Sequence, residues 1–164
     1  ELDMHDFLKH YITPKSGRII HVNGAQVGTH DGAAYYTIGQ REGLGIAKGY
    51  PVYITRIDAK SNTIFIGSKN EASKREFLVK DLHFALGNKG DGSILKNRTV
   101  PFILALKVKI RYNHQETNAE IYPFARQTRI IFKKPQFAIT PGQSAVFYAH
   151  GRVLGGGIID QIIE

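Results

Sequence analysis

The 164-residue sequence contains no cysteine, and this absence limits both its structure and its chemistry. Without thiols the chain forms no disulfide framework, holds no metal through thiolates and offers no cysteine nucleophile. It also lacks any apolar run near the ~20 residues of a membrane-spanning helix. Its first residues, Glu1–His5, have neither the basic start nor the apolar stretch of a signal peptide. These absences predict a soluble, cytoplasmic protein with no membrane partner.

A recognisable catalytic or metal site is also missing. The seven histidines are scattered, and no pair has the spacing of metal ligands. His30 and Asp31 resemble a catalytic pair, but no serine or thiol nucleophile accompanies them. The sequence therefore predicts no catalytic residue and no metal site in this chain.

Acidic residues are few in one long stretch of the chain. The formal net charge is +8 and the pI is about 9.7. Between Lys96 and Lys134, nine basic residues stand against two acidic ones, so nearly all of the excess charge lies in the second half. A basic half of this kind favours an anionic partner such as nucleic acid.

The chain is long enough for one domain or two small ones, and 42% hydrophobic residues suffice for a core. We expect a mainly β protein that begins with a short amphipathic helix. Asp3 is a suitable N-cap for that helix, and Pro14 and Gly17 would end it. The apolar side of the helix would carry Met4, Phe7, Leu8 and Tyr11.

Residues 1–72 are then predicted to form a small β-rich domain built from two strand pairs. The first pair, residues 18–22 and 25–27, flanks Asn23–Gly24, which predicts a type I′ hairpin turn with positive φ at both residues. The second pair, residues 52–57 and 63–67, flanks a polar turn at 58–62. The polar run 68–76 has no apolar periodicity and marks the expected boundary.

Residues 73–164 are predicted to form a C-terminal β-barrel. Residues 87–93 are expected to be an exposed loop. Four short strand-like runs follow, with a further one after the turn at His150–Gly151, and this spacing is typical of a closed barrel. The four runs are 104–112, 119–122, 128–132 and 144–148. Gly155, Gly156 and Gly157 lie between apolar residues and predict a barrel corner or bulge.

The run 104–112 alternates strictly between apolar and other residues. As a strand it would place Lys107, Lys109 and Arg111 on one face, ~7 Å apart, which is close to the spacing of phosphates along a nucleic-acid strand. The same pattern is also typical of the solvated face of an antiparallel sheet. Composition alone leaves both interpretations open.

Two glycine-containing segments also invite a functional interpretation. Pro141–Gly142 favours a tight turn that presents Gln143 outward, although a glutamine there could simply close the turn. Residues 39–46 are rich in glycine, but they lack both the Gly-Lys-Ser/Thr end of a P-loop and the strand-then-helix setting of a dinucleotide fingerprint. We therefore reject a phosphate-loop interpretation.

Three segments resemble signatures of the tRNA-specific 2-thiouridylases. They are Tyr36–Ile46, the stretch Thr140–Tyr148 followed by Leu154–Ile159, and the lead-in Asp6–Ile20, and they occur in the order found in that family. The family makes a thiouridine at the wobble position with ATP and a cysteine-bound persulfide. The resemblance implies that this chain carries the central and C-terminal domains, with the barrel similar to the second domain of translation elongation factors. It also implies that the ATP-binding domain and both active cysteines lie outside, since Glu1 falls just after the expected second cysteine.

The resemblance further implies which residues contact tRNA. Arg111 and Tyr112 match an arginine–tyrosine pair through which these enzymes bind tRNA, and Gln143 matches a tRNA-contacting glutamine. Asn113 and His114 stand where a further arginine is usual. Weaker candidates for RNA or interdomain contact are Gln40, Arg41, Lys107 and Lys109.

The resemblance implies no cofactor in this chain, which alone would be inactive, and ATP in the full-length enzyme. The implied partners are tRNA and, for the full-length enzyme, a sulfur-donor protein. A second hypothesis is a non-catalytic RNA- or ribosome-binding β-barrel module, which the basic barrel by itself would support. A third, an independent hydrolase, is disfavoured because no nucleophile or metal cluster is visible.

Overall fold

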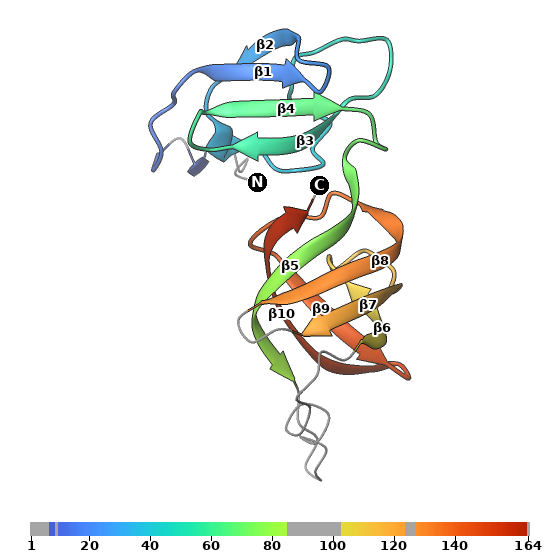
Figure 1. Cartoon of the computed structure of the whole chain (residues 1–164). Helices are drawn as coiled ribbons and strands as arrows, with labels where there is room; N and C mark the ends of the chain where they lie inside the picture. The colour runs from blue at the N-terminus through green and yellow to red at the C-terminus, as the bar shows by residue number, and fades with distance from the viewer. Residues whose placement is uncertain (1–6, 9, 85–102, 124–126, 164) are drawn as a thin grey trace. The chain divides into compact units, whose positions relative to one another are not determined.

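The protein is described from a computed structural model, which covers residues 7–8, 10–84, 103–123 and 127–163. The chain divides into two compact units, residues 1–73 and 74–164, and both are built of β-strands (Figure 1). The expected mainly β class is therefore confirmed. Of the expected N-terminal helix, Phe7 and Leu8 are helical, residues 10–12 form a turn and a bend, and residues 1–6 and 9 lie outside the described residues. The expected loop at 87–93 lies outside them as well.

The first unit is a four-stranded sheet with the order β2-β1-β4-β3. Its strands are β1 (Gly17–His21), β2 (Gln26–His30), β3 (Tyr53–Asp58) and β4 (Thr63–Gly67), with a short 3-10 helix η1 (Ala33–Tyr35) after β2. Both predicted strand pairs are confirmed as antiparallel hairpins. They join through a parallel pairing of β1 with β4 in the middle of the sheet (Figure 1), which local sequence patterns do not predict.

The core of this unit lies on one face of the sheet. Ile19, Ile54, Ile64 and Ile66 are at most 1% exposed and point into it. Leu44 and Val52, from the segment between η1 and β3, pack against the same isoleucines. The glycine-containing loop is therefore anchored to the sheet by apolar side chains.

The turn between β1 and β2 differs from the type I′ turn that Asn23–Gly24 predicts. Gly24 has a φ of 92°, but Asn23 is not among the residues with positive φ. The Gly24 N–H donates to the His21 carbonyl at 2.8 Å, and the His21 N–H donates to the Ala25 carbonyl at 2.8 Å. The hairpin thus has a longer loop in which only the glycine takes the left-handed conformation, a common alternative to the two-residue turn.

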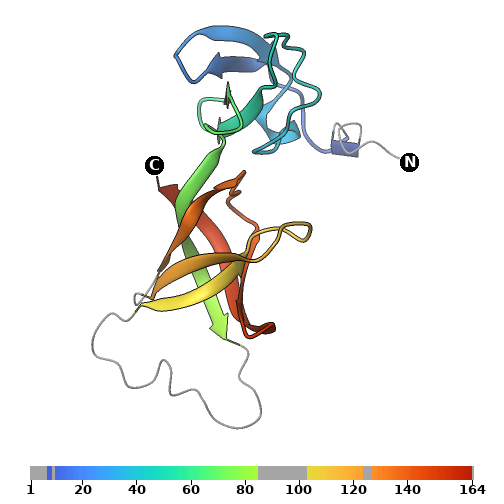
Figure 2. The ribbon, with the colours of Figure 1, turned by 90° about the vertical axis from the view of Figure 1, so that its right-hand side faces the viewer.

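The second unit is a closed barrel, as the sequence predicts, and its strand order is β10-β5-β8-β7-β6-β9 (Figures 1 and 2). Its strands are β5 (Ser73–Phe84), β6 (Leu104–Lys109), β7 (Thr117–Pro123), β8 (Thr128–Phe137), β9 (Ser144–Ala149) and β10 (Arg152–Ile163). Phe77, Phe132 and Phe147, all fully buried, fill the interior together with isoleucine and valine side chains.

Strand β5 was not predicted, because its start lies inside the polar run 68–76. Residues 73–76 of that run already belong to the strand, and the next part of the strand contains the buried residues Phe77 and Val79. The length of the last strand was also underestimated, because β10 continues through the three glycines to Ile163.

The predicted bulge at the three glycines is confirmed. The register of β10 shifts between Val153 and Gly155 against β9, and between Gly156 and Ile158 against β5. A Cβ atom on Gly155 would lie 2.2 Å from the His83 carbonyl oxygen, and Gly155 has a φ of 157°. Glycine is therefore required where neighbouring backbones approach this closely.

Candidate nucleic-acid interface

The basic strand β6 follows the predicted alternation over its length, but it ends at Lys109 and not at Tyr112. Val108 is buried, whereas the Lys107 side chain is 57% exposed. Ile110, just beyond the strand, is still anchored in the barrel core. Residues 111–114 then form a turn in which the His114 N–H donates to the Arg111 carbonyl at 3.1 Å. Arg111 and Tyr112 are thus presented by a turn at the barrel end.

The alternation predicted that the Arg111 side chain would project into solvent, but in the structure it does not. Its side chain is partly buried, Nε donates to Gln143 Oε1 at 3.3 Å, and Nη2 donates to Thr140 Oγ1 at 2.9 Å. The expectation of a solvent-facing arginine is wrong in this respect, because strand alternation no longer applies after Lys109. Two neutral acceptors, the side chains of Gln143 and Thr140, help to orient the guanidinium.

Gln143 follows the predicted tight turn, since Gly142 has a φ of 88°. The Gly142 N–H donates to the Ile159 carbonyl, and the Ile159 N–H donates to the Gln143 carbonyl, both at 2.8 Å. These two hydrogen bonds fix the turn to β10. The Gln143 side chain is partly buried, and its Oε1 accepts a hydrogen bond from Arg111 Nε. This oxygen therefore helps to orient the guanidinium.

Tyr112 is 91% exposed, the most exposed of the large hydrophobic residues that the structure describes. The Lys109 ammonium lies 5.5 Å from the centre of its ring. An exposed aromatic ring beside cations is the arrangement that stacks on unpaired bases while neighbouring charges bind phosphates. Tyr112 therefore presents its ring to solvent.

Partial burial and positive charge shape the electrostatics of this end of the barrel. Burial lowers the pKa of Arg111, yet a guanidinium remains charged at any physiological pH. Burial also lowers the pKa of His114, and the nearby charges of Arg111 and Lys109 lower it further. His114 is therefore held in its neutral form near pH 7, and the positive charge is carried by the arginine and lysine.

Sequence reasoning missed Thr140 and His114 as members of this cluster. Thr140 Oγ1 donates to the Ala138 carbonyl at 3.0 Å while it accepts from Arg111. A threonine before Pro-Gly carries no local signal of a contact with a residue 29 positions earlier. His114 was noted only as a departure from the family pattern.

Lys107 and Lys109 lie on the outer side of β6, as predicted. Lys107 Nζ lies 3.7 Å from Glu116 Oε2 in an exposed ion pair. Such pairs contribute little and exchange readily, so Lys107 can turn to a phosphate at small cost.

Gln40 and Arg41 belong to the other unit. Gln40 is used within its own loop: Oε1 accepts from the Thr37 N–H at 3.0 Å, and Nε2 donates to the Glu42 carbonyl at 2.9 Å. In addition, the Gly39 N–H and the Gln40 carbonyl pair with Ile54 of β3. These bonds assign Gln40 a structural role inside its loop.

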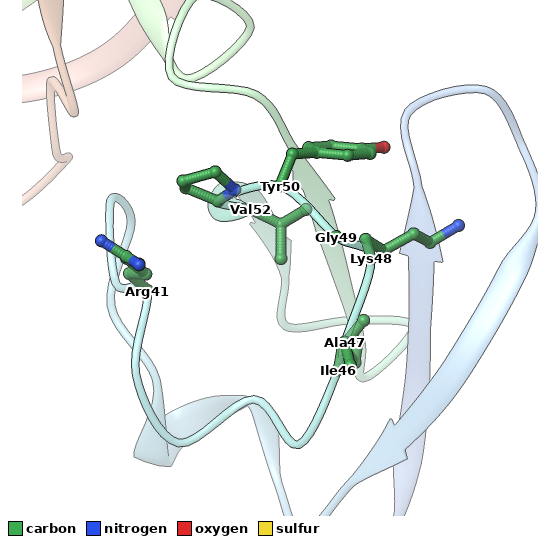
Figure 3. Close-up of a pocket in the computed structure, with 8 residues that line it drawn as sticks. Arg41, Ile46, Ala47, Lys48, Gly49, Tyr50 and Val52 are labelled. Carbon is green, nitrogen blue, oxygen red and sulfur yellow. The ribbon is translucent and has the colours of Figure 1, made fainter.

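Arg41 lines a hollow of about 340 Å³ together with residues 46–52. Figure 3 shows that Arg41 and Lys48 come from opposite limbs of the loop and that their charged ends point away from each other. Two cations that diverge do not form a phosphate cradle, in agreement with rejection of a phosphate loop. Arg41 remains an exposed candidate for contact with RNA or with another domain.

His30 is 3% exposed, and its Nδ1 accepts from the Gly32 N–H at 3.0 Å. Burial lowers its pKa, outweighing the Asn62 backbone and Asp31, which raise it. The histidine is a neutral structural residue.

Among residues that the structure describes, no three His, Cys, Asp or Glu side chains gather as a metal site. No helix within the described ranges has the length and hydropathy to cross a membrane.

Comparison with known families gives two matches in chain order. Residues 5–68 match the model described as the tRNA methyl transferase PRC-barrel domain, and residues 74–159 match the aminomethyltransferase beta-barrel domain. The second match covers the barrel described above.

Curated relatives resemble the chain over nearly its whole length. A protein of Synechocystis named tRNA-specific 2-thiouridylase MnmA is 40% identical over 157 residues, 95% of this chain and 41% of its own length. Proteins of the same name from Acetivibrio thermocellus and Clostridium beijerinckii are 42% and 39% identical, over 88% and 91% of this chain and 38% and 39% of their own lengths. The chain thus spans about two fifths of the length of these relatives.

Proposed function

Because the chain belongs to the tRNA-specific 2-thiouridylase family, we propose that it is the part of such an enzyme that binds and orients tRNA. The whole enzyme would act in the cytoplasm and replace the 2-oxygen of the wobble uridine with sulfur, using ATP and a persulfide delivered by a sulfur-donor protein. The 164 residues contain no cysteine, so the persulfide would be carried by a thiol elsewhere in the enzyme.

One observation carries this proposal: Arg111 is held by Gln143 beside the exposed ring of Tyr112. The arginine and the glutamine are 32 residues apart in sequence, and the barrel brings them together. An oriented guanidinium binds a phosphate with two parallel hydrogen bonds, and fixing it beforehand reduces the entropy lost on binding.

Tyr112 adds a contact of a different kind. An aromatic face stacks on any base, so together with Arg111 it would hold a stacked base and its neighbouring phosphate. Lys109 lies close enough to the ring to bind an adjacent phosphate. Such a surface grips RNA without performing chemistry, which agrees with the lack of a nucleophile in this chain.

The proposal is tested by titrating labelled tRNA with the 164-residue chain and with its Arg111→Ala and Tyr112→Ala variants. Lys60→Ala is a matched charge control, because Lys60 is exposed in the β3–β4 turn of the other unit. We expect both interface variants to weaken binding and the control to match the unaltered chain. Equal affinity of all four proteins for tRNA would contradict the proposal.

The same titration separates a 2-thiouridylase part from a ribosome-binding barrel. Half of the samples would contain purified ribosomal RNA as a competitor at equal nucleotide concentration. If the chain is part of a 2-thiouridylase, tRNA should be retained. Preferential loss to ribosomal RNA would favour the module with no modifying activity.

A further inference from the structure

A second hollow lies on the outside of the barrel, and Lys107 is one of the residues that line it. Its volume is about 460 Å³. Strands β6, β7, β8 and β9 and the β9–β10 turn contribute its lining residues, among them Lys107, Asn118, Lys133, Tyr148 and His150. Of these residues, only Lys107 was predicted from the sequence as a candidate for RNA contact.

Strand register brings these side chains into one row. Lys107 pairs with Asn118 on one side and with Tyr148 on the other. Lys133 directly follows Phe132, which pairs with Ala119, so it extends the row across β8. Neighbouring strands are ~4.8 Å apart, which puts the Lys107 and Lys133 strands about 10 Å from each other.

The hollow exists because small residues stand beside this row. Ala105, Ala149 and Gly151 line it, and none of them carries a side chain longer than a methyl group. At the tight turn, His150 and Gly151 have φ values of 50° and 73°, which directs the chain sharply from β9 into β10. The result is a recess with cations, an aromatic ring and an amide on its walls.

We propose that this recess is a second RNA subsite, in which a nucleotide of the bound strand lies with its phosphate between Lys107 and Lys133. The inference rests on the proposed tRNA-binding function. Tyr148 offers a ring surface to the ribose or base, and the Asn118 amide can donate to and accept from a base edge or a 2′-hydroxyl.

Continuity with the Arg111 surface identifies the occupant as the same RNA. Lys107 and Lys109 are two residues apart on the outer side of β6, ~7 Å along the strand, and Arg111 follows in the turn. This spacing is close to that of successive phosphates in a nucleic-acid strand. The cations therefore form a track from the turn to the recess.

Glu116 would compete with a phosphate for Lys107. Its carboxylate lies 3.7 Å from the Lys107 ammonium and would be displaced by a phosphate. Neutralising Glu116 removes both that competition and a repulsive charge. If the subsite exists, neutralising Glu116 should raise the affinity for tRNA. A purely structural role for Lys107 predicts no such gain.

The test measures the affinity of the 164-residue chain for unmodified tRNA at several salt concentrations. Lys133→Ala should weaken binding and reduce the log–log salt slope by about one unit, as for one phosphate contact. Lys134→Ala is the matched control, because the adjacent lysine is exposed but does not line the recess. Tyr148→Leu should weaken binding about 5- to 150-fold with an unchanged slope, the range for one stacking contact. Glu116→Gln should tighten binding.

The outcomes separate this inference from the proposed function. If Arg111→Ala weakens tRNA binding but Lys133→Ala, Tyr148→Leu and Glu116→Gln all match Lys134→Ala, the recess is not a subsite and the proposed function stands. If the unaltered chain fails to bind tRNA at low salt, both fall. Circular dichroism of each variant confirms that it is folded, and Glu116→Gln, whose predicted effect is a gain, remains informative even if Tyr148→Leu unfolds.

Discussion

Arg111 combines a positive charge with an orientation that Gln143 and Thr140 help to fix, and we expect it to have the largest effect. Arg111→Ala should weaken tRNA binding by about 1–3 kcal/mol, the range for a charge-assisted contact. The free energy of unfolding should fall by only about 1 kcal/mol, since the lost hydrogen bonds join partly exposed groups. Fluorescence titration and urea unfolding measure the two quantities. A large loss of stability with unchanged affinity would assign Arg111 to the fold.

Gln143 contacts Arg111, so the two residues should act as a unit. Gln143→Ala alone should weaken tRNA binding by about 1 kcal/mol. In the double variant with Arg111→Ala, the second change should add little, because an absent arginine needs no orientation. A double-mutant cycle measures the coupling, which should be about 1 kcal/mol, the whole effect of Gln143→Ala alone. Additive losses would instead indicate that Gln143 contacts tRNA independently.

His30 makes the stability of the chain depend on pH. Its pKa is lowered in the folded state, mainly by burial, so the unfolded chain binds the proton more tightly. Stability should therefore be full above the unfolded pKa of about 6.5 and fall as the pH drops below it toward the folded pKa. Urea unfolding at pH 7.5 and pH 5.0 should show a smaller drop for His30→Gln than for the unaltered chain. Equal drops would contradict this role of His30.

The secondary structure shows which elements local sequence patterns predict and which they do not. Both hairpins of the first unit were predicted, because their turns carry strong signals at Asn23–Gly24 and at residues 58–62. The parallel pairing of β1 with β4 joins residues some 45 positions apart, and no local pattern encodes it. Strand β5 was missed because Lys74, Arg75 and Glu76 mask the alternation at its start.

The candidate interface shows the same limit. The outward positions of Lys107 and Lys109 follow from alternation within β6, and the positive φ of Gly142 follows from the Pro-Gly pair. The contact of Arg111 with Thr140 and Gln143 depends on closure of the barrel, which brings two turns together. Sequence spacing gives no measure of such closure.

The glycine bulge of β10 depends on a close approach of neighbouring backbones. A Cβ atom on Gly155 would lie 2.2 Å from the backbone oxygen of His83. Gly155→Ala should therefore destabilise the barrel by about 1–3 kcal/mol or more. Gly28→Ala, a strand glycine whose nearest neighbour would be 3.7 Å away, is the control and should change stability by less than about 1 kcal/mol. Similar thermal unfolding of both variants would contradict the close approach.

The molecule as a whole has a net charge of +8, concentrated in the half that forms the barrel. It contains no cysteine. The 164-residue chain alone should form no 2-thiouridine when it is incubated with tRNA, ATP and a persulfide donor, because it has no thiol to carry the sulfur. Mass spectrometry of digested tRNA measures the product. Thiouridine formation by the purified chain would contradict a purely tRNA-binding role.

The most direct measurement is the salt dependence of tRNA binding by this chain. If Arg111 and the lysines of β6 bind phosphates, the logarithm of the association constant should fall linearly with the logarithm of salt concentration, by roughly one unit of slope for each contact. The slope should become shallower by about one unit in Arg111→Ala and stay unchanged in Tyr112→Ala, which removes stacking but no charge. An affinity that does not depend on salt, or a slope that Arg111→Ala leaves unaltered, would contradict the account.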